Sequence, residues 1–291
     1  MEVQSPILSL RGVRKAYGYN VVLDNLDLEI HPGRFYALLG RNGTGKSTLM
    51  RLLMRHEAWD KGSGQAFGLD MALDRAVFNE NTGFVSENVF FNFFKMNVGS
   101  VLRYQKSLRP CWDDAYVAEA LRILKIPVEA GFGALSRGQK MQVAFLAATA
   151  FSPKLLLLDE ITSVLDLVAR DYFLSRLDRF VDEGGTVVVA TNIISEVQHY
   201  LDQVILLQGK KVKFNSSLSD LRRQFVRARK GKGDQHELFS GSDCVELGMD
   251  QDGTLNLLLP RDIANALPPA LLSPEPPSVS DIFLFMSKAR E

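Results

Sequence analysis

One glycine-rich run in this chain combines residue types and a spacing that point directly to chemistry. It reads GRNGTGKST and covers residues 40–48. The run fits the P-loop pattern, in which a glycine and four further residues precede Gly-Lys and a serine or threonine. In such a loop the backbone amides close on phosphate oxygens, the lysine neutralises the outer phosphates, and the hydroxyl is a ligand of Mg²⁺. The run therefore predicts binding of a nucleoside triphosphate.

The positions of the loop have distinct expected roles. Glycines lack a Cβ, so the backbone can bend into a nest of amides that faces an anion. Lys46 supplies the positive charge, and Ser47 offers its hydroxyl to Mg²⁺. The whole loop is expected to line the nucleotide site: Gly40, Arg41, Asn42, Gly43, Thr44, Gly45, Lys46, Ser47 and Thr48.

A strand and a helix must hold this loop in place. Residues 34–40, RFYALLG, are typical of a short buried strand, and residues 47–54, STLMRLLM, of a helix that begins at the loop. The N-terminus of that helix adds a partial positive charge to the phosphate site. The flanking sequence thus agrees with the motif.

Two adjacent carboxylates form the second candidate site. Residues 154–160, KLLLLDE, are a continuous apolar strand that ends in Asp159 and Glu160. The carboxyl end of a buried parallel strand is where α/β folds place their chemistry. We expect Asp159 to hold Mg²⁺ through its coordination shell and Glu160 to polarise a water molecule. An apolar run with one Asp also fits an ordinary core strand, but its position after a P-loop favours the functional interpretation.

Two further residues are candidates for contact with a nucleotide. Ser136, in the run LSRGQ, suits the N-cap of an Ala-rich helix, so its hydroxyl and the following amides would face an anion. Tyr17 lies on an expected turn upstream of the P-loop. Its ring either stacks on a purine base or packs at a sheet edge, and the residue pattern alone leaves both alternatives open.

The composition narrows the class of protein. A length of 291 residues favours one or two domains, and Lys+Arg and Asp+Glu both total 34, so no global field indicates a nucleic-acid partner. Cys111 and Cys244 are far apart and fit a reducing cytoplasm without a disulfide framework. We find no signal peptide and no apolar run near the ~20 residues of a membrane span. Any membrane role is therefore expected to come through a partner.

The remaining pattern describes an alternating α/β chain with a helical insert at about residues 87–152. Expected strands cover residues 7–11, 21–23, 26–30, 82–87, 186–190 and 203–207. Expected helices cover residues 98–108, 113–124, 140–151, 168–180 and 195–201.

The order of these motifs resembles the nucleotide-binding domain of ABC ATPases, over about residues 5–215. Walker A corresponds to residues 40–48, the signature to 135–139, Walker B to 155–159 with Glu160 after it, and the D-loop to 163–166. The resemblance implies an α/β P-loop NTPase fold of the ABC type. That fold has a RecA-like core, an antiparallel β-subdomain and a helical subdomain, here in a domain of residues 1–215.

The resemblance also implies partners and further site residues. Two copies, expected to be identical, would enclose two ATP molecules, with Ser136, Gly138 and Gln139 of one protomer and the D-loop Asp166 at the ATP of the other. Tyr17 falls where the family has its adenine-stacking aromatic residue. A separately encoded transmembrane permease would dock near residues 87–102. This arrangement places the chain at the cytoplasmic face of a membrane, the bacterial inner membrane in particular.

Two departures from the family pattern affect catalysis. Glu87 stands where the family usually has Gln, and its carboxylate is expected to reach Mg²⁺ or the attacking water. Asn192 replaces the switch His, and an Asn side chain accepts and donates hydrogen bonds but cannot carry a positive charge. We predict retained ATP binding with slow hydrolysis. The alternatives are an ABC ATPase outside transport, and a regulatory subunit that hardly hydrolyses ATP.

Residues 216–291 are expected to form a small α+β extension, similar to that of many ABC-2-type exporter ATPases, and this similarity carries the expectation of export. We expect a helix at residues 218–225, a hairpin of residues 244–247 and 254–259, a Pro-rich linker at 268–277 and a helix at 280–288. A basic run at residues 222–232 is expected to end the first helix. It either contacts anionic lipid headgroups or is a solvated helix face and linker.

Overall fold

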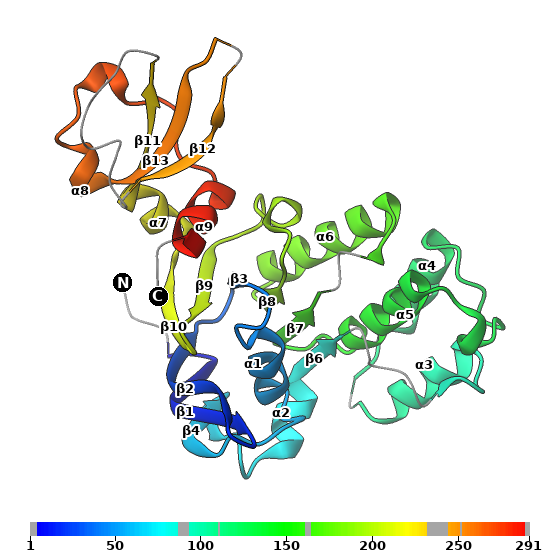
Figure 1. The fold of residues 1–291 in the computed structure, drawn as a ribbon. Helices are drawn as coiled ribbons and strands as arrows, with labels where there is room; N and C mark the ends of the chain where they lie inside the picture. The colour runs from blue at the N-terminus through cyan, green and yellow to red at the C-terminus, as the bar shows by residue number, and fades with distance from the viewer. Residues whose placement is uncertain are drawn as a thin grey trace.

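The computed structural model describes residues 5–86, 93–109, 111–160, 164–231, 244–250 and 252–288 (Figure 1). Its strands are β1 (Leu8–Tyr17), β2 (Asn20–Ile30), β3 (Phe35–Leu39), β4 (Lys61–Ala66), β5 (Leu69–Asp70), β6 (Thr82–Val85), β7 (Leu155–Asp159), β8 (Thr186–Ala190), β9 (Gln203–Gln208), β10 (Lys211–Ser217), β11 (Phe225–Lys230), β12 (Val245–Met249) and β13 (Leu255–Pro260). Its α-helices are α1 (Lys46–Leu53), α2 (Arg75–Asn81), α3 (Val98–Ser107), α4 (Asp114–Ile123), α5 (Arg137–Thr149), α6 (Leu167–Asp182), α7 (Leu218–Gln224), α8 (Arg261–Ala264) and α9 (Val279–Lys288).

A six-stranded sheet forms the centre of the molecule. Its order is β10-β9-β3-β8-β7-β6, and all neighbouring pairs are parallel except β10 and β9. Every residue of β3 and β8 is buried, because both faces of the sheet are covered, and this is why these strands are continuous apolar runs. The carboxyl ends of β3, β7 and β8 meet at one edge. This edge brings the P-loop, Asp159 and the residues after Ala190 together.

An antiparallel sheet of order β2-β1-β4-β5 lies beside the P-loop helix α1 (Figure 1). Two separate strands were expected at residues 21–23 and 26–30, but they form the single strand β2. Asn25 interrupts its regular geometry with a φ of 48°. Asparagine tolerates this left-handed conformation better than most residues, so the strand bends there without ending.

The helices α3, α4 and α5 form the helical subdomain, with an apolar cluster of their own. The expected helices at residues 98–108 and 113–124 are confirmed as α3 and α4. Each begins at a side-chain cap: Asn97 accepts from the amide of Ser100, and Asp113 accepts from the amide of Tyr116, both at 2.8 Å. Such caps satisfy amides that have no partner within the helix.

The segment between β8 and β9 differs from the prediction. The helix expected at residues 195–201 is wrong, and the structure has only a single 3₁₀ turn, η4 (Ile194–Glu196). The amide of Val197 donates to the carbonyl of Ile194 at 3.0 Å, and one bond four residues back, from the amide of Gln198 to the same carbonyl at 2.9 Å, does not extend the turn into a helix. Ile194, Val197 and Leu201 are buried, and their spacing of three and four residues imitates a helix. Isolated turns can satisfy the same spacing.

The C-terminal extension contains α7, a three-stranded antiparallel sheet of order β11-β13-β12, α8 and α9. The expected hairpin is confirmed as β12 and β13, and the last helix as α9. The basic run was expected to end a helix, but Arg227, Arg229 and Lys230 lie on β11. The sheet has a small apolar cluster on one side, and Phe225 of β11 and Leu258 of β13 join α7 and α9 in the cluster of the central sheet. The extension thus folds onto the core.

Candidate nucleotide site

The P-loop connects β3 to α1 and depends on glycine at particular positions. Gly43 and Gly45 have φ of 80° and 102°, in the left-handed region. A Cβ on Gly40 would lie 2.6 Å from the hydroxyl oxygen of Thr44, and one on Gly45 would lie 2.9 Å from Val22. Side chains would therefore both strain and block this loop.

Lys46 is a buried cation at the first turn of α1, with an exposed fraction of 6%. Its Nζ donates to the carbonyl oxygens of Gly40 at 2.7 Å and Arg41 at 3.2 Å. Burial lowers its pKa, and the negative charges of Glu160 and Asp159 oppose that shift. Within the described part of the chain no carboxylate lies within ion-pair distance of Nζ. The charge is held by neutral carbonyls beside an open loop.

Asp159, the last residue of β7, is a partly buried carboxylate next to Ser47. Burial, and then the neighbouring charge of Glu160, raise its pKa to about 6, against the hydrogen bond from Ser47. Its Oδ1 is buried without a hydrogen-bond partner among the described residues. A serine hydroxyl beside an incompletely bonded carboxylate is a donor set that Mg²⁺ favours. The residues present fit the metal.

Glu160 and Asn192 join the ends of β7 and β8. Glu160 has a φ of 52°, which is uncommon for a residue other than glycine. Its amide donates to the carbonyl of Ala190, and the Nδ2 of Asn192 donates to its Oε1, both at 2.9 Å. The Glu160 carboxylate thus accepts from a neutral donor in the segment that follows β8.

Lys46, Glu160 and Asn192 share one open hollow of about 470 Å³, and Asp159 lies outside its lining. It is lined by Val22, Asn42, Gly43, Gly45, Lys46, Ser47, Thr48, Glu160 and Asn192. A second cavity, of about 500 Å³, continues from Ser47, Asp159 and Glu160 toward α2 and α3. The structure therefore unites the predicted residues of the P-loop, of the end of β7 and of the end of β8.

The signature residues lie elsewhere. Ser136 is the N-cap of α5, as predicted, and its hydroxyl accepts from the amide of Gln139 while the Gln139 side chain accepts from the amide of Ser136, both at 3.1 Å. Gly138 packs closely, since a Cβ there would lie 2.7 Å from the carbonyl oxygen of Val164. Asp166 caps α6 by accepting from the amide of Ala169 at 2.9 Å. Ser136, Gly138, Gln139 and Asp166 do not line the hollow of their own chain.

Tyr17 lies at the end of β1, outside the lining of the hollow. Its hydroxyl donates to Glu57 and accepts from Arg51 at 3.3 Å, and its ring is 43% exposed. The structure accordingly shows a contact at the sheet edge, and Lys15 Nζ lies 5.2 Å from the ring centroid, so the ring is only partly open to a base. Glu87 and Ser163 lie outside the described residues.

The basic side chains of the second cavity were not predicted from the sequence. Arg51, His56 and Arg109 line it together with the two carboxylates of the site. Arg51 lies four residues after Ser47 on α1, and this spacing places both on one helix face. The spacing could therefore have predicted that Arg51 lies near the site. Arg109 follows α3 and had no such signal.

Comparison with known proteins agrees with this geometry. A sequence model described as ABC transporter matches residues 23–163. The aliphatic sulfonates import ATP-binding protein SsuB of Yersinia pestis is 36% identical over 220 residues, which cover 72% of this chain and 75% of that protein. The chain belongs to the ABC transporter family. It is an ATP-binding subunit of that family and an ATPase.

Two further similarities support the assignment. The phosphonates import ATP-binding protein PhnC of Bdellovibrio bacteriovorus is 31% identical over 255 residues, covering 81% of this chain and 97% of that protein. A solved ATP-binding subunit of an ABC transporter superposes with a TM-score of 0.68 at 22% identity, over 75% of this chain and 92% of that one, and shows the same fold. No helix within the described ranges has the length and apolar character to cross a bilayer.

Proposed function

We propose that this ABC ATPase binds ATP with Mg²⁺ at the end of β3, hydrolyses it with Glu160 as general base, and drives transport through a separately encoded membrane subunit. The observation that carries the proposal is the shared hollow. It places Lys46, Ser47 and Glu160 around one space, with the incompletely bonded oxygen of Asp159 beside it. Bound Mg²⁺ would neutralise charge on the β- and γ-phosphates.

The residues of the chain take separate parts in this reaction. Lys46 Nζ, which donates to the carbonyls of Gly40 and Arg41 without nucleotide, would donate to phosphate oxygens when ATP binds along the same loop. Ser47 and Asp159 would hold the metal. Glu160 would orient a water molecule and accept its proton.

Asn192 would keep the Glu160 carboxylate in position through the 2.9 Å hydrogen bond. Because its amide remains neutral, it adds no charge to the developing transition state. We therefore propose slow basal hydrolysis with ATP binding retained.

Two identical copies would complete the site. Ser136, Gly138 and Gln139 lie outside the hollow of their own chain, so their contact with ATP needs a second protomer. Leu167 and Val168, directly after the D-loop residue Asp166, are 79% and 67% exposed. An apolar pair of this kind suits an interface that forms when ATP binds.

The proposal extends to the membrane partner and to the direction of transport. We place the chain at the cytoplasmic face of a bacterial inner membrane, bound to its permease. We propose export because the extension, from about residue 216, is similar to that of exporter ATPases. SsuB and PhnC are named for import, so the permease must be identified before direction can be assayed.

Capture of the full chain from gently detergent-extracted native membranes tests the partner. A polytopic membrane protein in near-equal amount is expected. A chain that stays soluble, or that brings ribosomes or DNA, would contradict the transport proposal and leave the ATPase assignment in place.

Substitution of the general base tests the chemistry. Glu160→Gln should lower turnover by about 10²-fold or more, the range for loss of acid–base catalysis, with ATP affinity retained. Glu183→Gln is the matched control, because that carboxylate pairs with Arg179 on the exposed side of α6. Full turnover in Glu160→Gln would contradict the assignment.

A further inference from the structure

The C-terminal helix α9 packs against the turn that follows Asn192. It lies against η4, and Ile194 and Val197 belong to the same buried apolar cluster as Val279, Ile282 and Met286 of α9. The last helix of the chain is therefore part of the packing that supports the residues after β8.

The same helix reaches β3, the strand that leads into the P-loop, and its neighbour β9. One narrow apolar gap is lined by Leu39 of β3, Leu206 of β9, and Ile282 and Met286 of α9. Leu39 is the residue directly before Gly40. Close-packed interiors transmit displacements, so the seating of α9 bears on the nucleotide site.

Asn192 is held by its neighbours in the chain. Thr191 is buried and its hydroxyl accepts from the amide of Ile193 at 3.0 Å. Ile194 is buried at 5% exposure in the cluster shared with α9. Between these anchors the side chain of Asn192 donates to Glu160. A shift of Ile194 would consequently move the donor that holds the general base.

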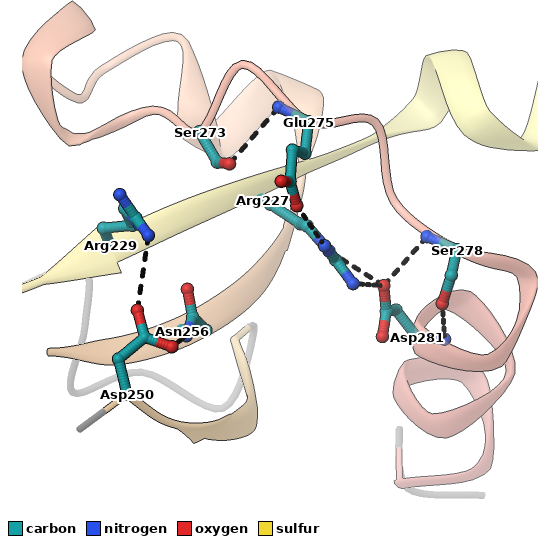
Figure 2. A network of polar contacts seen from close by, with 8 residues as sticks. All are labelled: Arg227, Arg229, Asp250, Asn256, Ser273, Glu275, Ser278 and Asp281. Carbon is teal, nitrogen blue, oxygen red and sulfur yellow. Dashed lines mark hydrogen bonds and ion pairs between the residues drawn. The ribbon is translucent and has the colours of Figure 1, made fainter.

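An ion pair seats α9 on the extension. Figure 2 shows Asp281, near the start of α9, accepting from the Nε and Nη2 of Arg227 on β11, at 2.9 and 2.6 Å. Asp281 also accepts from the amide of Ser278, whose hydroxyl accepts from the amide of Asp281. The side chains of Arg227 and Asp281 are only 26% and 14% exposed. A half-buried pair with two charge-assisted bonds constrains geometry more than an exposed one.

We propose that α9 positions the switch segment, and that Arg227 is the positioning residue that keeps α9 seated. Three contacts connect Arg227 to the general base. Arg227 pairs with Asp281 of α9, α9 packs against η4, and Asn192, just before η4, donates to Glu160. The inference rests on the proposed roles of Asn192 and Glu160. It makes the extension a regulator of hydrolysis: a partner that loosens α9 lowers kcat and leaves ATP binding intact.

The first test is Arg227→Gln in the full chain, a change that leaves the Ser278–Asp281 cap intact. We expect kcat to fall roughly threefold to tenfold, the usual range for a coupling network, while the Kd for ATP stays within about twofold. Arg227→Lys, which keeps the charge, should give an intermediate kcat. Arg229→Gln is the matched control on the same strand: its contact with Asp250 is 3.3 Å long and its side chain is 57% exposed.

A double-mutant cycle distinguishes positioning from general loss of stability. In an Asn192→Ala background, Arg227→Gln should have no further effect on kcat, because its route to Glu160 is already broken. Hydrogen exchange of residues 191–197 should rise in Arg227→Gln, with exchange of α1 unchanged. An equal fall of kcat in both backgrounds would overturn the proposal, and so would faster exchange in α9 with an unchanged kcat.

Failure of the proposed function gives a different result. If Glu160→Gln retained turnover, the assignment of the general base would fall. The exchange of residues 191–197 would still report whether Arg227 seats α9 on the turn.

Discussion

The nucleotide site and the C-terminal extension hold their cations in opposite ways. Lys46 is buried and, within the part of the chain that the structure describes, its Nζ donates to the carbonyls of Gly40 and Arg41. Arg227 is held by the carboxylates of Asp281 and Glu275. The site contains two carboxylates as well, yet neither forms an ion pair with the lysine. Among the described residues, the cation of the site is thus held by neutral oxygens, whereas the cation of the extension is held by opposite charges.

This difference has an energetic consequence. A buried charge without a matched partner destabilises the folded state, and it often marks a functional site for that reason. The raised pKa of Asp159 and the lowered pKa of Lys46 both have burial as their largest cause. Binding of ATP with Mg²⁺ would compensate both charges at once.

Lys46→Ala should have the largest effect on the nucleotide site. It removes the cation that the loop reserves for phosphate, and charge-assisted hydrogen bonds contribute about 1.5–3 kcal/mol, so the Kd for ATP should rise about 10- to 100-fold. Calorimetric titration with ATP and Mg²⁺ measures it. Lys211→Ala, on the exposed edge strand β10, should bind as the wild type does. Equal affinity of the two variants would contradict the role of Lys46.

Asn192→His should raise turnover by about threefold or more, because an imidazolium beside Glu160 can stabilise developing charge. Its rate should also acquire a dependence on pH near the ordinary pKa of His, about 6.5. Steady-state phosphate release between pH 6 and 8 measures both effects. Asn192→Gln serves as the neutral control. Unchanged turnover in Asn192→His would remove Asn192 as the cause of slow hydrolysis.

The charge of Asp159 should appear in the pH dependence of stability without nucleotide. Its pKa is raised from 3.8 to about 6 in the folded chain, so its contribution to stability is fully present below pH 3.8 and is lost as pH rises through 6. Asp159→Asn should therefore raise the melting temperature at pH 7.5, by roughly 2–4 °C, and the difference should disappear at acidic pH. The same variant should lose stabilisation by Mg²⁺. A constant difference across pH would show that Asp159 is not the titrating group.

Arg229→Gln should have the smallest effect. Exposed ion pairs contribute about 0–1 kcal/mol, so its unfolding midpoint in urea should match the wild type within error. Arg227→Gln, which leaves the 14% exposed Asp281 without its partner, should lower the midpoint. Equal shifts in the two variants would remove the distinction between an architectural pair and a surface pair.

The sequence predicted the elements that carry the site, because their constraints are local. A loop that wraps phosphate needs its glycines, and strands buried on both faces must be apolar, as β3, β7 and β8 are. The strand β10, in contrast, reads KVKFNSS and has mostly exposed or half-buried residues. It forms because it pairs with β9, and the residues of β10 alone do not predict that pairing.

The contacts between distant residues were equally hidden. The hydrogen bond from Asn192 to Glu160 requires β7 and β8 to be neighbours, which the order of residues does not specify. Arg227 looked like part of a solvated basic run, since the acidic partners Glu275 and Asp281 lie about fifty residues further along the chain. The spacing of residues predicted which side chains could bind nucleotide, whereas the contacts between distant side chains depended on the fold.

Hydrogen exchange with and without ATP and Mg²⁺ tests whether the residues at the ends of β3 and β7 bind the nucleotide. The Glu160→Gln chain is suited to it, because its nucleotide should persist during the measurement. We expect strong new protection in residues 40–48 and 155–159, which would bind the nucleotide and Mg²⁺, and unchanged exchange in β11, β12 and β13. Protection that is absent from the P-loop, or equal in the extension, would contradict this assignment.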